Sequence, residues 1–200
     1  MQLLSAPASP FARKARVVVI EAGLEDAVEI VDVTATPIGE PDPRLLTANP
    51  VGKIPTLVRH DGPALYDSRV ICRYLDAVAG TKLYPEDAIW DTLTLEATAD
   101  AIMDAAVLMT YERRFRAEPN ADWLAGQWAK IERALSALEA RWMSHLEGPD
   151  MIGQIAVGCA LAYLDFRHAD REWRRGHGAL SAWEGRFAQR PALKATMPEG

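Results

Sequence analysis

Between Asn49 and Ser68 the sequence sets polar groups of both charges around two short apolar runs. Lys53 supplies an ammonium group, and Asp67-Ser68 supplies a carboxylate and a hydroxyl. The Ile54-Pro55 step leaves backbone groups free beside it, because proline cannot donate to a sheet ladder. Together these groups suit a small peptide that carries two carboxylates and one ammonium group.

A hairpin is predicted to hold these groups. Residues 56–58 and 64–66 predict two short strands, and Asp61-Gly62 between them is a hairpin signal. Asp67-Ser68 follows the second strand and is predicted to open a helix. Polar groups therefore lie at both ends of the hairpin unit.

Ser9 is a further candidate, because it stands directly before Pro10. Serine at the cap and proline at the first helical position are the expected order at a helix start, and Gly23 is predicted to end this helix. A capping hydroxyl accepts a backbone N–H and still has a proton to donate. The alternative for an isolated Ser-Pro pair is a plain cap without a chemical role.

The composition narrows the classes of partner. The chain has 200 residues and a net charge of -6, and its basic residues form only short pairs, which argues against binding to nucleic acid. Cys72 and Cys159 lie in apolar helical patterns, which predicts inert thiols in a reducing, cytoplasmic compartment. The histidines lack metal-ligand spacing, so we expect no metal site. We expect no membrane association, because there is neither a signal peptide nor an apolar run of about 18 residues.

Residues 1–80 are predicted to form a small α/β domain. Its elements are a strand at 2–5, a helix at 9–23, a strand at 28–33, a short helix at 43–48, the hairpin and a helix at 69–79. The first strand, helix and second strand imply a parallel pair with a right-handed crossover.

Residues 81–88 are predicted to be a linker to an all-helical second domain, residues 89–200. Its predicted helices are 89–117, 122–146, 152–170 and 180–189. The third is apolar on all sides, which predicts burial at the centre of the bundle. Met151 at its start cannot accept a backbone hydrogen bond as a cap, whereas Gln154 can bond back to the chain at the third position.

The pattern Asn-Pro-x-Gly-Lys-Ile-Pro-x-Leu-Val at 49–58, followed by Asp67-Ser68, resembles the glutathione site of the cytosolic glutathione S-transferases. Ser9-Pro10-Phe11 is similar to the active turn of bacterial members, and 155–161 is similar to the core helix of the second domain. The resemblance covers most of the chain. It implies a thioredoxin-like α/β N-terminal domain, an all-α helical bundle C-terminal domain and a cis Ile54-Pro55 bond, although only about 5 to 6 % of X-Pro bonds are cis in folded proteins.

The resemblance also implies a role for each candidate residue. Ser9 would activate the thiol of glutathione, with the helix amino terminus adding partial positive charge. Lys53 would meet the glycyl carboxylate, and the Ile54 backbone would pair with the cysteinyl main chain. Asp67 would face the γ-glutamyl ammonium, and the Ser68 hydroxyl would face the γ-glutamyl carboxylate.

The implied function is a glutathione S-transferase of the detoxification type, in which glutathione is the co-substrate and no other cofactor is needed. The second substrate would be a small apolar electrophile held between Phe11 and the helical domain. A homodimer is expected, in which Asp104 is a candidate to reach the neighbouring subunit's γ-glutamyl group.

Two alternatives stay open. One is glutathione-dependent reduction of disulfides or peroxides, in which the bound thiolate does the redox chemistry because the 9–12 turn holds no cysteine. The other is a binding or adaptor protein without turnover. Lys53, Asp67 and Ser68 argue against the adaptor, because it would not need a γ-glutamyl pocket.

Overall fold

The computed structural model describes residues 1–199, and these fold as two compact units. The first unit comprises residues 1–84 together with the residues from Pro191 onward, and the second comprises residues 85–190. The described residues contain no helix that is both long and apolar enough to cross a membrane.

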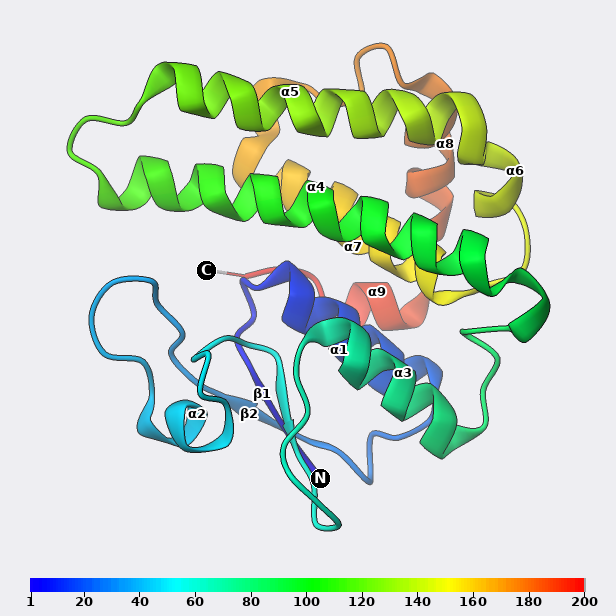
Figure 1. Cartoon of the computed structure of the whole chain (residues 1–200). Helices are drawn as coiled ribbons and strands as arrows, with labels where there is room; N and C mark the ends of the chain where they lie inside the picture. The colour runs from blue at the N-terminus through cyan, green and yellow to red at the C-terminus, as the bar shows by residue number, and fades with distance from the viewer. Residues whose placement is uncertain (200) are drawn as a thin grey trace. The chain divides into compact units, whose positions relative to one another are not determined.

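The first unit is built on a small mixed sheet (Figure 1). Its strands are β1 (Gln2–Ser5), β2 (Glu29–Asp32) and β3 (Thr56–Val58), in the order β2-β1-β3. β1 pairs with β2 in parallel and with β3 antiparallel. The parallel pair joined by a helix is the arrangement expected from the sequence.

Helices cover the sheet because successive side chains of a strand point to opposite faces. Leu4 packs in one cluster with Val33 and with Leu45 of α2 (Pro43–Ala48). Leu3 points to the other face and is fully buried. α1 (Pro10–Glu21) and α3 (Ser68–Ala79) pack against each other on the side of the sheet away from α2 (Figure 1).

The expected second strand of the hairpin is reduced to a single bridge. Leu57 and Leu65 exchange two backbone hydrogen bonds, of 3.0 and 2.9 Å, and no longer ladder forms among the described residues. Pro63 has no N–H to extend the ladder, and Arg59 Nε donates to its carbonyl at 2.9 Å. The bridge is enough to set the register of the chain that leads into α3.

The end of the chain packs in the first unit. α9 (Pro191–Ala195) contacts α1, and Arg13 of α1 donates through Nη2 to the Leu193 carbonyl at 3.0 Å and through Nε to Thr196 Oγ1 at 3.4 Å. Only 2 % of Arg13 is exposed. The structure therefore groups α9 with the α/β unit, whereas the sequence analysis placed residues 89–200 in one helical domain.

The second unit is helical throughout. Its elements are a 3-10 turn η1 (Glu86–Ala88), α4 (Ile89–Phe115), α5 (Ala121–Ala137), a π turn η2 (Leu138–Trp142), α6 (Met143–Leu146), α7 (Ile152–His168), a 3-10 turn η3 (Ala169–Arg171) and α8 (Gly178–Phe187). The helix expected at 122–146 is found as one continuous helical run from Ala121 to Leu146, which changes to a π turn at η2. Within η2, Glu139 accepts hydrogen bonds from the amides of Ala179 and Leu180 at the start of α8.

α7 forms the core of this unit, as expected. Its residues from Ile152 to Leu161 are all buried, and it packs against α4. At its start Gln154 Oε1 accepts the Met151 N–H at 3.2 Å, which confirms the predicted bond back to the chain. Gln154 Nε2 also donates to the carbonyls of His145 and Pro149, at 2.8 and 2.7 Å, so this side chain ties the α6–α7 loop to the helix.

Candidate functional site

Two strand registers bring the predicted site residues of the first unit to one end of the sheet. Leu4 of β1 is paired with Thr56 of β3, and Leu57 is paired with Leu65. Because both pairings are antiparallel, the chain after β1 runs beside the Ile54-Pro55 step, and the same step runs beside the chain that enters α3. The turn that carries Ser9, the Ile54-Pro55 step and Asp67 thus share this end of the sheet.

Ser9 is the amino-terminal cap of α1. Its backbone is extended, its Oγ accepts the Ala12 N–H at 3.2 Å, and its own N–H donates to the Ala6 carbonyl at 3.1 Å. Pro10 follows in the first turn, where a missing N–H costs nothing. The serine oxygen is used as an acceptor, and among the described residues no acceptor is recorded for the hydroxyl proton of Ser9.

The Ile54–Pro55 peptide bond is cis, which confirms the expectation from the resemblance, and the Tyr66–Asp67 bond is cis as well. Lys53 is exposed at the mouth of this loop, and Ile54 is half-buried. The Lys53 ammonium is therefore accessible to an anionic group from solvent.

Asn49 and Thr56 hold the same loop from inside, a role that sequence analysis did not assign. Asn49 is 1 % exposed and Thr56 is fully buried. Asn49 Nδ2 donates to the Lys53 carbonyl at 2.9 Å and to Thr56 Oγ1 at 3.0 Å, and the Thr56 hydroxyl donates to the same carbonyl at 2.9 Å. In the sequence, only the polar character of Asn49 and Thr56 and their positions on either side of Ile54-Pro55 indicated this role.

Asp67 is the cap of α3, and Arg69 is its partner. The Arg69 N–H donates to Asp67 Oδ1 at 3.1 Å, and Arg69 Nη2 lies 3.2 Å from Oδ2. Burial raises the pKa of the Asp67 carboxyl, but the hydrogen bonds and charge of Arg69 and the charge of Lys14 outweigh burial, so the pKa lies below its ordinary value of 3.8. Asp67 is thus a carboxylate at neutral pH, and its side chain is 59 % exposed.

Ser68 is the first residue of α3 and only 2 % of it is exposed. The cap is therefore Asp67, and Ser68 lies one position inside the helix, where amide N–H groups point toward an incoming anion. Sequence analysis found this pair but did not foresee that Arg69 would engage the carboxylate of Asp67.

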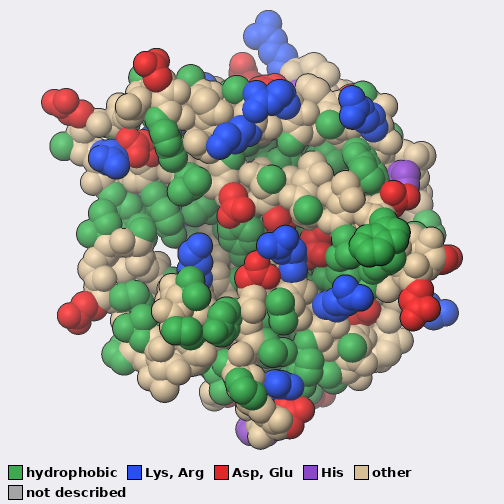
Figure 2. Space-filling view, in the orientation of Figure 1, with side chains coloured by type: hydrophobic (Ala, Val, Ile, Leu, Met, Phe, Trp, Pro, Cys, Tyr) green, Lys and Arg blue, Asp and Glu red, His purple; other side chains and the backbone are tan. Residues whose placement is uncertain are grey.

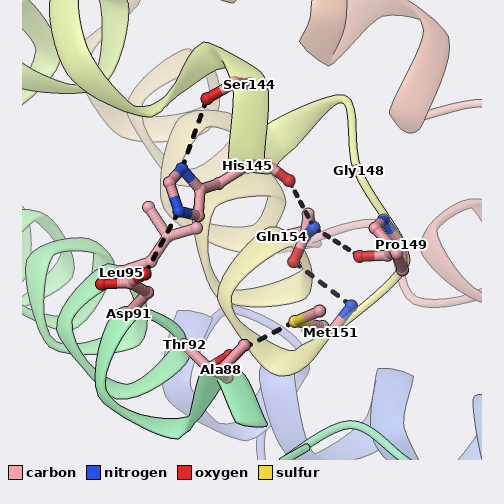
Figure 3. A pocket seen from close by; sticks show the side chains of 10 residues that line it. All are labelled: Ala88, Asp91, Thr92, Leu95, Ser144, His145, Gly148, Pro149, Met151 and Gln154. Carbon is pink, nitrogen blue, oxygen red and sulfur yellow. Dashed lines mark hydrogen bonds and ion pairs between the residues drawn. The ribbon is translucent and has the colours of Figure 1, made fainter.

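A cavity of about 210 Å³ lies elsewhere, in the second unit, between the start of α4 and the α6–α7 loop (Figure 3). Ser144 Oγ lies 3.5 Å from His145 Nδ1, and His145 Nε2 lies 3.4 Å from Asp91 Oδ2. These distances exceed the reach of about 2.6 to 3.2 Å that proton transfer between a nucleophile and its base requires. All three side chains are exposed, so we read this chain of contacts as a link between α4 and α6.

The metal-ligating and basic side chains are dispersed in the part of the chain that the structure describes (Figure 2). Among residues 1–199, no group of three or more His, Cys, Asp or Glu side chains could hold a metal ion. The visible face in Figure 2 carries scattered basic side chains beside acidic ones, without a continuous basic stripe.

Comparison with known proteins agrees with the geometry. The family model described as glutathione S-transferase, N-terminal domain, matches residues 8–78, and the model described as glutathione S-transferase, C-terminal domain, matches residues 121–186. The uncharacterized GST-like protein YibF of Escherichia coli (strain K12) is 31 % identical over 179 residues, which cover 86 % of each chain.

Solved structures extend the similarity to the whole chain. A glutathione transferase family member from Pseudomonas fluorescens Pf-5 with bound glutathione is 46 % identical, with a TM-score of 0.96, and the match covers 100 % of this chain and 99 % of that one. A glutathione S-transferase from Methylobacillus flagellatus KT with glutathione bound is 34 % identical, with a TM-score of 0.84 and 99 % of each chain covered.

Proposed function

Since the chain belongs to the glutathione S-transferase family, we propose that it binds glutathione at the sheet end of the first unit and transfers the glutathione sulfur to a small apolar electrophile. It is an enzyme of the glutathione transferase type, and glutathione is the co-substrate of this family. The electrophile and the conjugation step are the new parts of the proposal.

One observation carries the proposal: complementary groups for all parts of glutathione lie at the same end of one sheet. Lys53 offers a cation for the glycyl carboxylate, and Asp67 offers an anion for the γ-glutamyl ammonium. The backbone of Ile54, two residues before β3, would pair with the main chain of the cysteinyl residue. The bound glutathione in the two relatives that span this chain supports the same ligand here.

Ser9 would then act on the sulfur. A free thiol titrates near about 8.5, so only a few per cent is thiolate at neutral pH. Donation of the free hydroxyl proton of Ser9 in a hydrogen bond would stabilise the thiolate, and the amino terminus of α1 would add partial positive charge. The thiol proton would go to solvent, and the thiolate would form a carbon–sulfur bond with the electrophile. In a substitution the leaving group departs with the electron pair of the broken bond; in an addition the displaced π electron pair stays on the electrophile, which then takes a proton from solvent.

Asp67 would exchange partners when glutathione binds. In the free protein its carboxylate is paired with Arg69, a contact that is largely exposed to solvent and therefore weak. The γ-glutamyl ammonium would add a second positive charge at the same carboxylate. Ser68 and the first N–H groups of α3 would receive the γ-glutamyl carboxylate.

We further propose a homodimer and a cytoplasmic location. Exposed apolar residues follow one stripe of α3, with Val70 47 % and Val78 49 % exposed, and the exposed stripe of α4 contains Ala97, Ala101 and Leu108. Small and apolar exposed stripes suit helix contacts at a two-fold axis. The location rests on the scarcity of cysteine, and both thiols are buried and free.

The test is calorimetry of the wild-type protein with glutathione, followed by turnover with a panel of electrophiles, disulfides and peroxides. We expect one glutathione site per chain and conjugation of aryl or alkyl halides. Turnover of disulfides or peroxides alone would replace transfer by the glutathione-dependent reduction considered above, and binding without any turnover would favour the non-catalytic alternative.

A further inference from the structure

We propose that Asn49 is a positioning residue, which fixes the Lys53–Ile54 peptide group so that its outer side can receive glutathione. This role rests on the glutathione site proposed above. Asn49 is buried, and its side-chain amide is engaged by the loop itself, so its role is one of positioning.

The Asn49 side chain is fully engaged by the loop that it precedes. Its two N–H groups go to the Lys53 carbonyl at 2.9 Å and Thr56 Oγ1 at 3.0 Å, and its Oδ1 accepts the Val51 N–H at 2.9 Å. A buried amide with all these bonds made is rigid, and each lost bond would leave a buried polar group without a partner.

The Lys53 carbonyl receives two donors, Asn49 Nδ2 and the Thr56 hydroxyl, both at 2.9 Å. The Lys53–Ile54 bond is trans, because the cis bonds among residues 1–199 are Ile54–Pro55 and Tyr66–Asp67. In a trans peptide the C=O and N–H groups point in opposite directions. With its carbonyl held toward the buried amide, the peptide directs the Ile54 N–H to the opposite side of the loop.

The anchor of this arrangement is the core of the first unit. The Asn49 N–H donates to the Leu45 carbonyl at 2.8 Å at the end of α2, and the Asn49 carbonyl accepts the Gly52 N–H at 2.9 Å. Leu45 is fully buried in the cluster with Leu4 and Val33. The Lys53–Ile54 peptide group is thus fixed by two side chains: that of Thr56, which lies in β3, and that of Asn49, which is anchored through α2 to the core.

A positioning role and a purely structural role predict different effects on binding. A positioning role affects the contacts with one part of the ligand, whereas a structural role affects all of them. Lys53 and Ile54 serve the glycyl and cysteinyl parts of glutathione, whereas Asp67 and Ser68 serve the γ-glutamyl part. γ-Glutamylcysteine keeps the cysteinyl part that would pair with Ile54 but lacks the glycine that Lys53 would hold. Loss of the Asn49 amide should therefore weaken both ligands, and glutathione more, because glutathione loses both contacts. General destabilisation of the fold would lower the affinity for both ligands by the same factor.

The experiment is calorimetry of the full chain with glutathione and with γ-glutamylcysteine, at a temperature where each variant is folded. For Asn49→Ala we expect the dissociation constant of glutathione to rise about tenfold and its preference over γ-glutamylcysteine to shrink. Asn120→Ala is the matched control: Asn120 caps α5 by accepting the Trp123 N–H at 2.9 Å, so it loses a comparable hydrogen bond in the second unit. We expect its ligand affinities to equal those of the wild type.

A pair of variants at Thr56 decides the matter if Asn49→Ala does not fold. Thr56→Val keeps the shape but removes one donor to the Lys53 carbonyl, and should raise the dissociation constant of glutathione several-fold, whereas Thr56→Ser should restore it. Equal affinities of Thr56→Val and Thr56→Ser, or wild-type affinity of Asn49→Ala, would overturn the positioning role while leaving glutathione binding intact. Failure of the wild type to bind glutathione would overturn both proposals.

Discussion

Ser9 Oγ accepts the Ala12 N–H at 3.2 Å, so the hydroxyl is oriented by the first turn of α1 while its proton stays available. If this proton stabilises the glutathione thiolate, Ser9→Ala should raise the pKa of the bound thiol by roughly one to two units, which corresponds to about 1.5 to 3 kcal/mol for a hydrogen bond to a charged group. Turnover at neutral pH should fall by about ten- to a hundredfold with little change in glutathione affinity. Thiolate absorbance against pH measures this directly.

The same substitution removes a helix cap, so a loss of about 1 kcal/mol in the free energy of unfolding is expected alongside. Superimposable titrations of the wild type and Ser9→Ala would mean that the amide groups of α1, or the buried Ser5 hydroxyl at the end of β1, activate the sulfur and that Ser9 is only a cap.

Asp67→Ala should weaken glutathione binding by about 1.5 to 3 kcal/mol, because a charged partner of the γ-glutamyl ammonium is lost. Asp42→Ala is a matched control, since Asp42 caps α2, accepts the Arg44 N–H at 2.8 Å and pairs with the Arg44 side chain in the same way. Calorimetry should show wild-type affinity for that control. An unchanged dissociation constant for Asp67→Ala would remove Asp67 from the site.

His168 should make the second unit sensitive to acid. The imidazole is fully buried, and its Nε2 donates to the Ala106 carbonyl at 2.9 Å. Burial lowers the pKa of His168 below its ordinary value of 6.5, against the opposing effect of the Ala106 bond. The folded state therefore keeps the neutral ring, and the unfolded state takes up a proton first as the pH falls. Stability from this residue is present above about pH 6.5 and is lost below it.

His168→Gln keeps an N–H donor but cannot titrate in this range. Urea unfolding at pH 7 and pH 5 should show a smaller loss of stability for this variant than for the wild type. His60→Gln, at an exposed position of the first unit, should lose as much as the wild type. Identical losses in all three proteins would exclude His168 as the source of acid sensitivity.

Gly153 marks a close approach of α7 to α4. A Cβ at this position would lie 2.8 Å from Leu95 Cδ2 and 3.1 Å from Leu95 Cβ, and Leu95 is only 3 % exposed. Gly153→Ala should therefore destabilise the fold by about 1 to 3 kcal/mol through overpacking. Gly126→Ala in α5, where nothing lies within 4 Å, should instead stabilise by about 0.4 to 1 kcal/mol. Thermal unfolding measures both effects. If the two substitutions shift the midpoint temperature in the same direction, this account of the contact between α4 and α7 is wrong.

The proposed homodimer predicts a sedimentation mass of twice the 22.0 kDa chain at micromolar concentration. Val70→Glu, on the exposed stripe of α3, should shift the protein toward the monomer, because it buries a charge in the contact. Ile38→Glu, at a loop position that is 60 % exposed, should not. A monomeric wild type would refute the dimer.

Local rules explain which parts of the structure were predictable. The short helix at 43–48 was foreseen with its bounds, because Asp42 and Pro43 supply a cap and a first-turn proline. The cis Ile54–Pro55 bond was foreseen from the pattern of residues between Asn49 and Ser68, whereas the ligand roles of these residues stay predictions. The helix expected at 122–146 was foreseen nearly to its bounds, but its π turn at 138–142 and the bonds of Glu139 to amides some 40 residues away were not. The contacts of Arg69 with Asp67 and of Asn49 with Thr56 depend on side-chain directions that periodicity does not contain.

The Arg13 contacts with Leu193 and Thr196 bear on the order in which the chain is made. These partners are separated by 180 and 183 positions, so the Arg13 guanidinium lacks these two acceptors until Leu193 and Thr196 have been synthesised. Loop closure over such a separation costs little more in stability than closure over half of it, about 0.6 kcal/mol, but contacts so distant in sequence form late. The α/β unit is therefore encoded first and completed last, and the helical unit has its full sequence available before its neighbour does.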